Sequence, residues 1–292
     1  MPAFNSEKTV RQAAMTTLRA MPQDSQLIVF DDCSTDQTLA VLETIRDPRL
    51  RLIRSADNVG GGAARNKMIE LSDSEYLAAM DADDVTLPWR FRLQLRALET
   101  ADVAFSSAVR FGDRVGLSAP TSLTVDELPP ALLFHCPVFH PSLTARRSAF
   151  ERVGNYISDR RVSGDLKVDD AEDYELWLRM ALSGVRMRRL GTPVLAYRLS
   201  SSQVTAGEAL AAVKRTPNRR LQEAYLDLCS FVLDIPPLAA DCEAIIETLE
   251  GHLHESLVRF RLLNRAHFAK LLASRPQTLS PRVFFRPPAV PS

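Results

Sequence analysis

Short apolar runs alternate with longer stretches in which apolar residues recur every three or four positions, through about the first hundred residues. The first pattern predicts strands and the second predicts helices. The predicted strands cover 26–30, 49–53, 75–80 and 103–111, and the predicted helices cover 6–20, 38–46, 62–72 and a segment opened by Pro88. Because such alternation is typical of a parallel sheet covered by helices, we expect an α/β fold, with the run at 75–80 as a buried strand.

The pattern changes twice further along the chain. Residues 112–169 read as Gly-, Pro- and Asp-rich turns, and residues 173–184 predict a helix that Gly184 can cap. After Thr205 the sequence looks wholly helical to about 272, and the end of the chain is rich in proline. We therefore predict a domain over 1–205, a helical extension over 206–275 and a poorly ordered tail over 276–292.

Composition restricts the class of protein. The chain has 292 residues, is 46% hydrophobic and balances 36 basic residues with 36 acidic ones. It can bury a full core, and no overall charge favours nucleic acid. Its four cysteines lie far apart without metal-ligand spacing, and no signal peptide or membrane-spanning stretch is evident. We expect a soluble cytoplasmic protein that makes at most peripheral contact with the inner face of the membrane.

Polar residues follow the predicted strands where ligands bind in open parallel sheets, beyond the carboxyl ends. Strand 26–30 runs into Asp31 and Asp32, and strand 75–80 runs into Asp81-Ala82-Asp83-Asp84. Between them lie three glycines, at 60–62, and Arg65 in the first turn of a helix. Clustered carboxylates repel each other unless a cation or shared protons offset their charge, and we expect the cluster to indicate a metal. A metal, an arginine and a glycine turn together suit a diphosphate.

Five segments together carry a family resemblance. PAFNSEKTV, VFDDCSTDQT, DNVGGGAARN and YLAAMDADDVTLPWRFRLQL, in this order and spacing, resemble glycosyltransferase family 2, and EDYELWLRM extends the match to about residue 205. The resemblance implies the GT-A fold, a Rossmann-like, mixed but mainly parallel sheet flanked by helices. It also implies transfer of a sugar from a nucleotide diphosphate donor to an acceptor hydroxyl on a carbohydrate or a lipid-linked molecule.

The resemblance assigns a role to each matching position. Phe4 would pack on the nucleobase, Asp32 would accept the imide N–H of uracil or thymine, and Arg65 would lie near the base or phosphates. Asp81 and Asp83 would form the D-x-D pair that binds Mn²⁺ or Mg²⁺, with Asp83 favoured as the direct ligand. Asp173 would be the general base of an inverting reaction.

Several of these residues also have a structural interpretation. Asp31 and Asp32 could cap a helix, Asp84 could lie beside the metal rather than bind it, and Asp173 could be an exposed helix acid. His140 could line the acceptor pocket or be a hydrogen-bonded structural histidine. Trp177 and the cysteines are expected to be packing residues.

The chain departs from the family pattern in three places. Many members have a histidine shortly after the YR of the last core strand, whereas Leu199 and three serines follow Tyr197-Arg198 here. The glycine turn has Gly61 and Gly62 where bulkier residues are common. The family also places an apolar strand directly before PAFN, so that strands 26–30 and 75–80 would lack a partner here. We expect that the natural protein begins upstream of Met1.

Two other functions fit parts of the sequence. MDADDV also matches the nucleophile motif of haloacid-dehalogenase-like phosphatases, with Asp81 as nucleophile and GDLKVDD as a later acidic motif. A glycosyltransferase-like module that binds nucleotide without turnover is the second alternative.

The C-terminal region carries a separate prediction. Residues 256–286 interleave arginines and a lysine with phenylalanines and leucines. A basic amphipathic helix there could lie on an anionic membrane, where lipid-linked acceptors would be found, or pack on the catalytic domain with its basic face in water.

Overall fold

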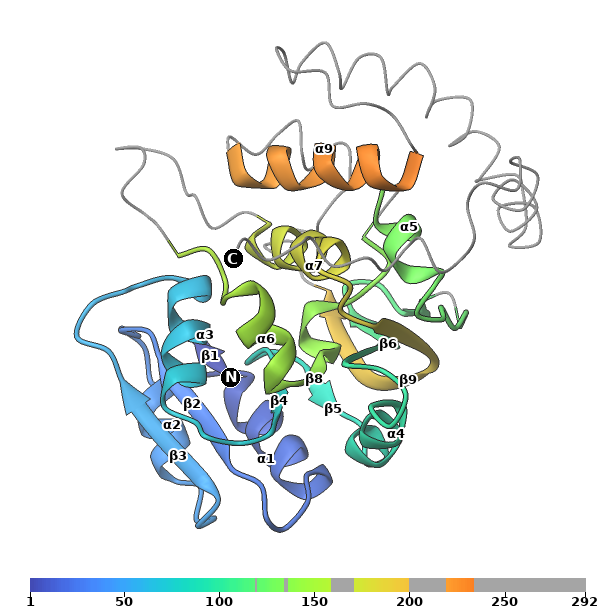
Figure 1. Ribbon diagram of the computed structural model, residues 1–292. Helices are drawn as coiled ribbons and strands as arrows, with labels where there is room; N and C mark the ends of the chain where they lie inside the picture. The colour runs from blue at the N-terminus through green and yellow to red at the C-terminus, as the bar shows by residue number, and fades with distance from the viewer. Residues whose placement is uncertain (119, 134–135, 159–170, 200–218, 234–292) are drawn as a thin grey trace.

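A computed structural model of the chain describes residues 1–118, 120–133, 136–158, 171–199 and 219–233 (Figure 1). The predictions for 206–218, for the basic helix over 256–286 and for the tail over 276–292 lie outside these residues. In the described ranges, no helix is long and apolar enough to cross a membrane.

Three parallel strands form the first sheet, in the order β1-β2-β3. They are β1 (Pro2–Ala3), β2 (Leu27–Asp31) and β3 (Leu50–Arg54), connected by α1 (Val10–Ala20) and α2 (Thr38–Glu43), and α3 (Gly61–Glu70) follows β3. The apolar spacing that predicted the first helix buries Val10, Ala13, Ala14, Thr17 and Leu18 on one face of α1. Local periodicity therefore predicted this half of the domain well.

The second sheet is mixed and has the order β4-β8-β6-β9-β5, with β7 paired to β6. Its strands are β4 (Tyr76–Ala78), β5 (Val85–Thr86), β6 (Val103–Gly112), β7 (Gly116–Leu117), β8 (Thr144–Arg146) and β9 (Met187–Leu199). The remaining helices are α4 (Arg90–Ala97), α5 (Leu128–Leu132), the 3₁₀ helix η1 (His140–Ser142), α6 (Arg147–Val153), α7 (Glu172–Leu182) and α9 (Arg219–Leu233). β6 and β9 run parallel, whereas β8 is antiparallel to both of its neighbours. The predicted α/β class is confirmed.

Strand β4 differs from the prediction of a buried strand at 75–80. Tyr76 is 37% exposed and Ala78 is also exposed. β4 pairs with β8 on one side, and no described strand pairs with its other side. On the first sheet, β2 bonds to the N-terminal residues instead, because the Phe30 and Asp32 N–H groups donate to the carbonyls of Met1 and Ala3 at 3.0 and 2.8 Å.

The segment predicted as turns contains several short elements in its described part: β7, α5, η1, β8 and α6. β8 has three residues and pairs with β4 through Tyr76 and Arg146 and with β6 through Val103 and Ala145. A strand this short shows no readable alternation of apolar and polar residues, and its pairing depends on chain segments far away in the sequence. The prediction for this segment was therefore wrong.

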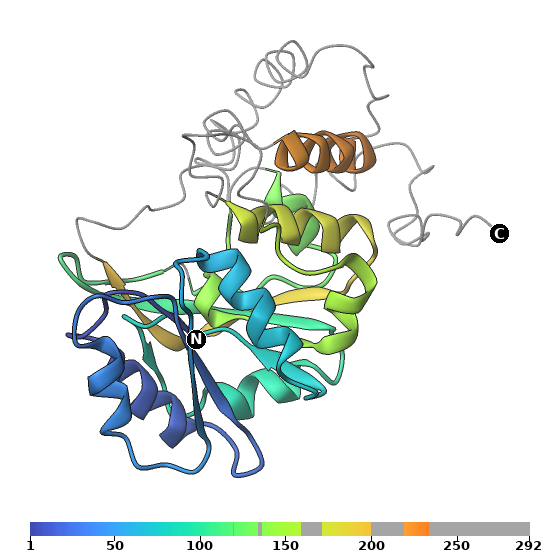
Figure 2. The same cartoon turned by 90° about the vertical axis from the view of Figure 1, so that its left-hand side faces the viewer.

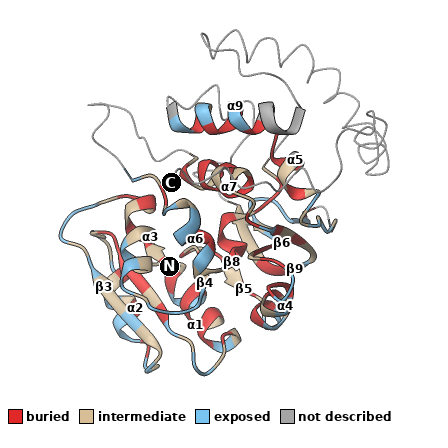
Figure 3. Cartoon of the chain, in the orientation of Figure 1, coloured by how far each residue is buried: buried red, intermediate tan, exposed pale blue. Residues whose placement is uncertain are grey.

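The larger hydrophobic core surrounds Trp177 of α7, in agreement with its predicted packing role. The Trp177 ring meets Phe105 of β6 edge to face at 4.8 Å between centroids. α9 belongs to the same core through its buried Leu221 and Tyr225, and the Tyr225 hydroxyl donates to the Leu133 carbonyl at 2.8 Å. Figure 3 shows the buried face of α9 turned toward α7. The described part of the predicted helical extension thus packs on the sheet domain.

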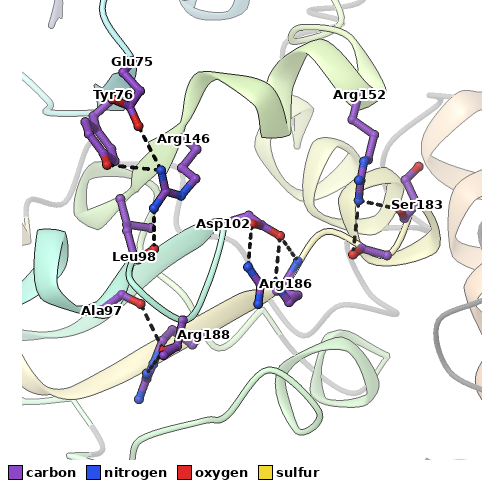
Figure 4. Close-up of polar contacts among 12 residues, drawn as sticks. Glu75, Tyr76, Ala97, Leu98, Asp102, Arg146, Arg152, Ser183, Arg186 and Arg188 are labelled. Carbon is purple, nitrogen blue, oxygen red and sulfur yellow. Dashed lines mark hydrogen bonds and ion pairs between the residues drawn. The ribbon is translucent and has the colours of Figure 1, made fainter. Parts of the chain in front are cut away.

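Ion pairs fasten the beginnings of the strands in the second sheet (Figure 4). Arg146 binds Glu75 at 2.9 Å just before β4, and Arg186 binds Asp102 at 3.2 Å beside the starts of β6 and β9. Each such surface pair contributes about 0–1 kcal/mol, so their main effect is on geometry. The carboxyl ends of β4, β6 and β9 lie at the opposite edge, where the acidic segment 81–84 follows β4.

Candidate functional site

Arg65 contacts acids from two other segments of the candidate site. Its Nη1 donates to Glu172 Oε1 at 2.7 Å, and its Nη2 lies 3.5 Å from Asp81 Oδ1. Glu172 begins α7, Asp81 follows β4, and Arg65 lies in α3. Figure 2 shows α3 and α7 near each other. The structure thus brings Asp81 and the helix carrying Asp173 to opposite sides of one guanidinium.

The glycine turn sets the position of α3. Gly60 has φ of 87°, a left-handed conformation that suits glycine. A Cβ on Gly62 would come within 2.7 Å of the Ile157 carbonyl oxygen, so α3 can begin here only without a side chain. The turn is held by Asp32, which accepts the Val59 and Gly60 N–H groups at 2.7 and 2.9 Å.

Asp32 is therefore a turn-binding residue in this structure. Its side chain is buried, and each carboxylate oxygen already accepts a backbone N–H. Neighbouring Asp31 is also buried, at the end of β2, and its Oδ1 has no hydrogen-bond partner in the described part of the chain. Neither residue caps α2, whose N-cap is Gln37. The role of Asp32 toward a nucleobase stays a prediction.

Phe4 lies on the surface, with half of its area exposed. Backbone and side-chain hydrogen bonds fasten its loop to the segment after Asp32, because Asn5 Oδ1 accepts the Thr35 N–H at 2.9 Å and Ser34 Oγ accepts the Asn5 N–H at 3.0 Å. This attachment keeps the exposed ring near the end of β2. The position is compatible with stacking on a base.

The three acids of segment 81–84 have different environments. Asp81 is partly exposed and faces Arg65, and the Asp83 carbonyl accepts Arg198 Nε at 2.8 Å. Asp84 is 1% exposed, accepts the Arg198 N–H at 2.7 Å through Oδ1, and has no described partner for Oδ2. Burial, with Asp81 close by, raises the pKa of Asp84 to about 9. Arg198 of the YR motif thus holds the segment in place.

The donor set fits a metal that a bound diphosphate would share. Asp81 and Asp83 offer hard carboxylate oxygens, which Mg²⁺ and Mn²⁺ prefer. Within the described ranges, no three His, Cys, Asp or Glu side chains gather as a protein-only metal site. Mg²⁺ is commonly bound by one or two carboxylates together with substrate phosphates. The residues are therefore consistent with a cation held between this segment and a nucleotide.

Asp173 is the second residue of α7. Its Oδ1 accepts the Tyr174 N–H at 2.7 Å, and Oδ2 makes no hydrogen bond to the described residues. Burial raises the pKa of Asp173, and the positive charge of Arg65 opposes that rise. The start of a helix also favours the ionised carboxylate. Asp173 is consequently not the exposed helix acid of the alternative interpretation.

His140 has the environment of a structural histidine. It is buried, its Nε2 shares a 2.9 Å hydrogen bond with the Tyr156 hydroxyl, and its ring stacks on Trp177 at 5.9 Å. Burial and the charge of Arg65 lower the pKa of His140 well below its usual value. A role in the acceptor pocket stays a prediction.

Two residues of the site, Glu172 and Tyr156, had no predicted role. The Tyr156 ring faces Arg65 at 5.7 Å, and its backbone N–H and C=O both bond to the Asn66 side chain, at 3.0 and 2.8 Å. The signals in the sequence were Asn66, an amide next to Arg65, and Glu172, an acid next to Asp173. Neither one indicates its partner, because the contacts join segments far apart in the chain.

The pKa of His140 leads to a prediction about stability. Because the folded state resists protonation of this ring, uptake of a proton by the unfolded chain removes stability as pH falls below about 6.5. We expect His140→Gln to lose less stability than the wild type between pH 7 and pH 5, by about 2 kcal/mol. Urea denaturation at both pH values measures the difference. Equal losses in both proteins would show that His140 takes up its proton in the folded state.

The chain is similar to proteins of a known family. The family described as "Glycosyl transferase family 2" matches residues 1–154. One curated relative is UDP-Glc:alpha-D-GlcNAc-diphosphoundecaprenol beta-1,3-glucosyltransferase WfaP of Escherichia coli. It is 24% identical over 220 residues, which are 73% of this chain and 81% of the relative.

Solved structures agree on the fold. TarS of S. aureus in complex with UDP-GlcNAc superposes with a TM-score of 0.56 at 18% identity, covering 79% of this chain and 71% of TarS. The mannosyltransferase PcManGT of Pyrobaculum calidifontis, in complex with GDP-Man and Mn²⁺, gives 0.51 at 16% identity, covering 86% and 78%. Both are GT-A glycosyltransferases, and the fold of this chain is GT-A.

Proposed function

Because the chain belongs to glycosyl transferase family 2, we propose that it is a metal-dependent, inverting hexosyltransferase that uses a UDP- or dTDP-sugar. Membership supports the coarser statement, that the chain is a nucleotide-sugar glycosyltransferase. One observation supports the finer proposal: Arg65 lies between Asp81, the candidate donor-side acid, and the first turn of α7, which carries the candidate base Asp173.

On the donor side, the leaving nucleoside diphosphate builds negative charge on its phosphate oxygens. A divalent cation held by Asp83 and Asp81 would supply the neutralising charge when bound. Arg65 adds a second positive charge beside Asp81. Asp32 holds the glycine turn in the shape that this side requires, and Phe4 offers an exposed ring to the base.

On the acceptor side, Asp173 takes the proton of the attacking hydroxyl. The Tyr174 N–H orients the carboxylate through Oδ1, which leaves Oδ2 for the proton. The acceptor oxygen then forms a bond to the anomeric carbon while the bond to the diphosphate oxygen breaks. Attack from the face opposite the leaving group inverts that carbon.

The acceptor is proposed at the level of class. The full name of WfaP describes a diphosphoundecaprenol-linked acceptor, and we propose a carbohydrate or lipid-linked acceptor for this chain. Peripheral contact with the inner face of the membrane through 256–286 stays a prediction, since those residues lie outside the described ranges.

A thermal-shift series with nucleoside diphosphates tests the donor class. UDP or dTDP with Mn²⁺ should raise the melting temperature, because a ligand at 100 times its Kd adds about 2.7 kcal/mol of stability. GDP and ADP should have little effect, and so should UDP or dTDP without metal. Equal stabilisation by all bases, or full stabilisation in the presence of a chelator, would contradict the proposal.

The two alternatives make different predictions. A module without catalytic activity would bind UDP or dTDP in that series yet release no diphosphate from any sugar donor. A phosphatase that uses Asp81 as nucleophile finds no support in the matched family. Its second acidic motif, GDLKVDD, falls at 164–170, outside the described residues.

A further inference from the structure

Three carboxylates compete for the charge of Arg65. Asp81 approaches from the end of β4, and Glu172 and Asp173 lie side by side at the start of α7. The guanidinium is hydrogen-bonded to Glu172 at 2.7 Å and is only loosely in contact with Asp81 at 3.5 Å. No described hydrogen bond joins Arg65 to Asp173. The choice of partner therefore leaves the carboxylate of Asp173 without a described hydrogen bond to the arginine, although the charge of Arg65 still acts on it.

The glycine turn makes room for this pairing. A Cβ on Gly61 would lie 3.0 Å from Arg65 Nη1 and 3.6 Å from Glu172 Oε1, and one on Gly62 would lie 3.4 Å from Glu172 Cγ. The 3.0 Å approach to Arg65 Nη1 is tighter than most Cβ contacts, whereas the two distances to Glu172 are ordinary van der Waals contacts. The two glycines that set this turn apart from the usual family pattern thus lie against the Glu172–Arg65 pair.

We propose that Glu172 is a positioning residue that holds Arg65 in an ion pair with itself, with Asp81 nearby, and so keeps the neighbouring Asp173 available as the base. The inference rests on the proposed role of Asp173 in the transfer reaction. Glu172 itself touches neither donor nor acceptor in this scheme and acts through Arg65.

Arg65 should pair with another carboxylate when Glu172 is removed, because the ion pair is buried. The side chains of Arg65 and Glu172 are 16% and 11% exposed. Breaking a buried ion pair leaves a charge that water cannot solvate well, so the freed guanidinium turns to another carboxylate within reach. Hydrogen bonds between charged groups are about twice as strong as neutral ones. An Arg65–Asp173 pair would hold the base in its ionised form and make it a poorer proton acceptor.

Among the described residues whose charges are coupled to Asp173, one is a cation. The titratable groups whose pKa is coupled electrostatically to Asp173 come from several elements. They are Arg65 of α3, Asp81 after β4, Cys136 before η1, Tyr156 after α6 and Tyr197 of β9, and Glu172 is its neighbour in α7. Arg65 is the positively charged member of this described set. Moving Arg65 should therefore change the pKa of Asp173 more than moving any other group of this set.

The pH dependence of transfer at saturating donor tests the inference. Glu172→Ala should lower kcat about 10- to 100-fold and move the acidic limb of the profile to lower pH by about one unit, since a paired carboxylate ionises more readily. Glu172→Asp should recover much of the rate. Adding Arg65→Gln to Glu172→Ala should move the limb above its wild-type position, because the positive charge that lowers the pKa of Asp173 is then removed. Glu70→Gln, an exposed acid on α3, is the control that should leave the profile unchanged.

Each outcome separates this inference from the proposed function. A lower kcat with an unshifted limb would reduce Glu172 to a structural residue, and an unchanged kcat would remove it from the mechanism. If Glu172→Ala does not fold in a melting experiment, Glu172→Gln serves as the test, with a smaller shift in the same direction. Near-normal transfer by Asp173→Asn would overturn both proposals, whereas an inactive Asp173→Asn beside an unshifted Glu172→Ala would overturn only this one.

Discussion

Asp173→Asn is expected to lower sugar transfer by about 100- to 10,000-fold while donor binding stays close to that of the wild type. The amide keeps the shape of the carboxylate and can still accept the Tyr174 N–H through its oxygen. It cannot take a proton from the acceptor hydroxyl. The loss should therefore appear in kcat, because the interaction that is removed is made during the transfer step.

Calorimetric titration of the donor diphosphate beside a sugar-transfer assay measures both properties. Asp227→Asn, an exposed acid on α9, controls for the loss of one negative charge and should transfer at the wild-type rate. In the wild type, the raised pKa of Asp173 should place the acidic limb of the rate profile above the pKa of about 3.9 of a free aspartate. Near-normal transfer by Asp173→Asn would remove Asp173 from the mechanism.

Asp83→Ala is expected to abolish the metal dependence of nucleotide diphosphate binding and to lower transfer by about 100-fold or more. The phosphates would then face the carboxylate of Asp81 with no well-held cation between them, and the repulsion would weaken binding. Binding and turnover should fall together in this variant, whereas they should come apart in Asp173→Asn.

Titrations of UDP or dTDP with Mn²⁺ and with a chelator measure this effect. Asp84→Asn is the matched comparison, because the buried Asp84 already accepts the Arg198 N–H and should not be a direct ligand. It should bind nucleotide in a metal-dependent way. If Asp83→Ala also keeps full metal dependence, the cation does not depend on Asp83 and the assignment passes to Asp81.

The local elements of the fold could be predicted from the chain because each one follows from nearby residues. The apolar spacing of α1 and the short run of β2 specify their own secondary structure, and the structure confirms both within a few residues. β8 could not be predicted in this way. Its three residues form a strand because β4 and β6 offer hydrogen-bonding edges on either side, and that condition arises only in the folded chain.

The chemistry of the site likewise has a part that the local sequence specifies and a part that depends on the folded chain. The sequence by itself determined which residue types follow the strands: the acids at 81–84, the glycine turn before α3, and Arg65 and Asp173 at the starts of helices. Those types indicate a diphosphate and a cation because charge and hydrogen-bonding capacity belong to the residue itself.

Only the tertiary structure decided which of these groups are partners. Asp32 turns both oxygens to the glycine turn, Asp84 is buried under Arg198, and Arg65 takes Glu172 in preference to Asp173. Arg65 and Glu172 are 107 positions apart, and no local pattern records that distance. Pairing depends on which charges burial brings within about 3 Å of each other, and burial is a property of the whole packed chain.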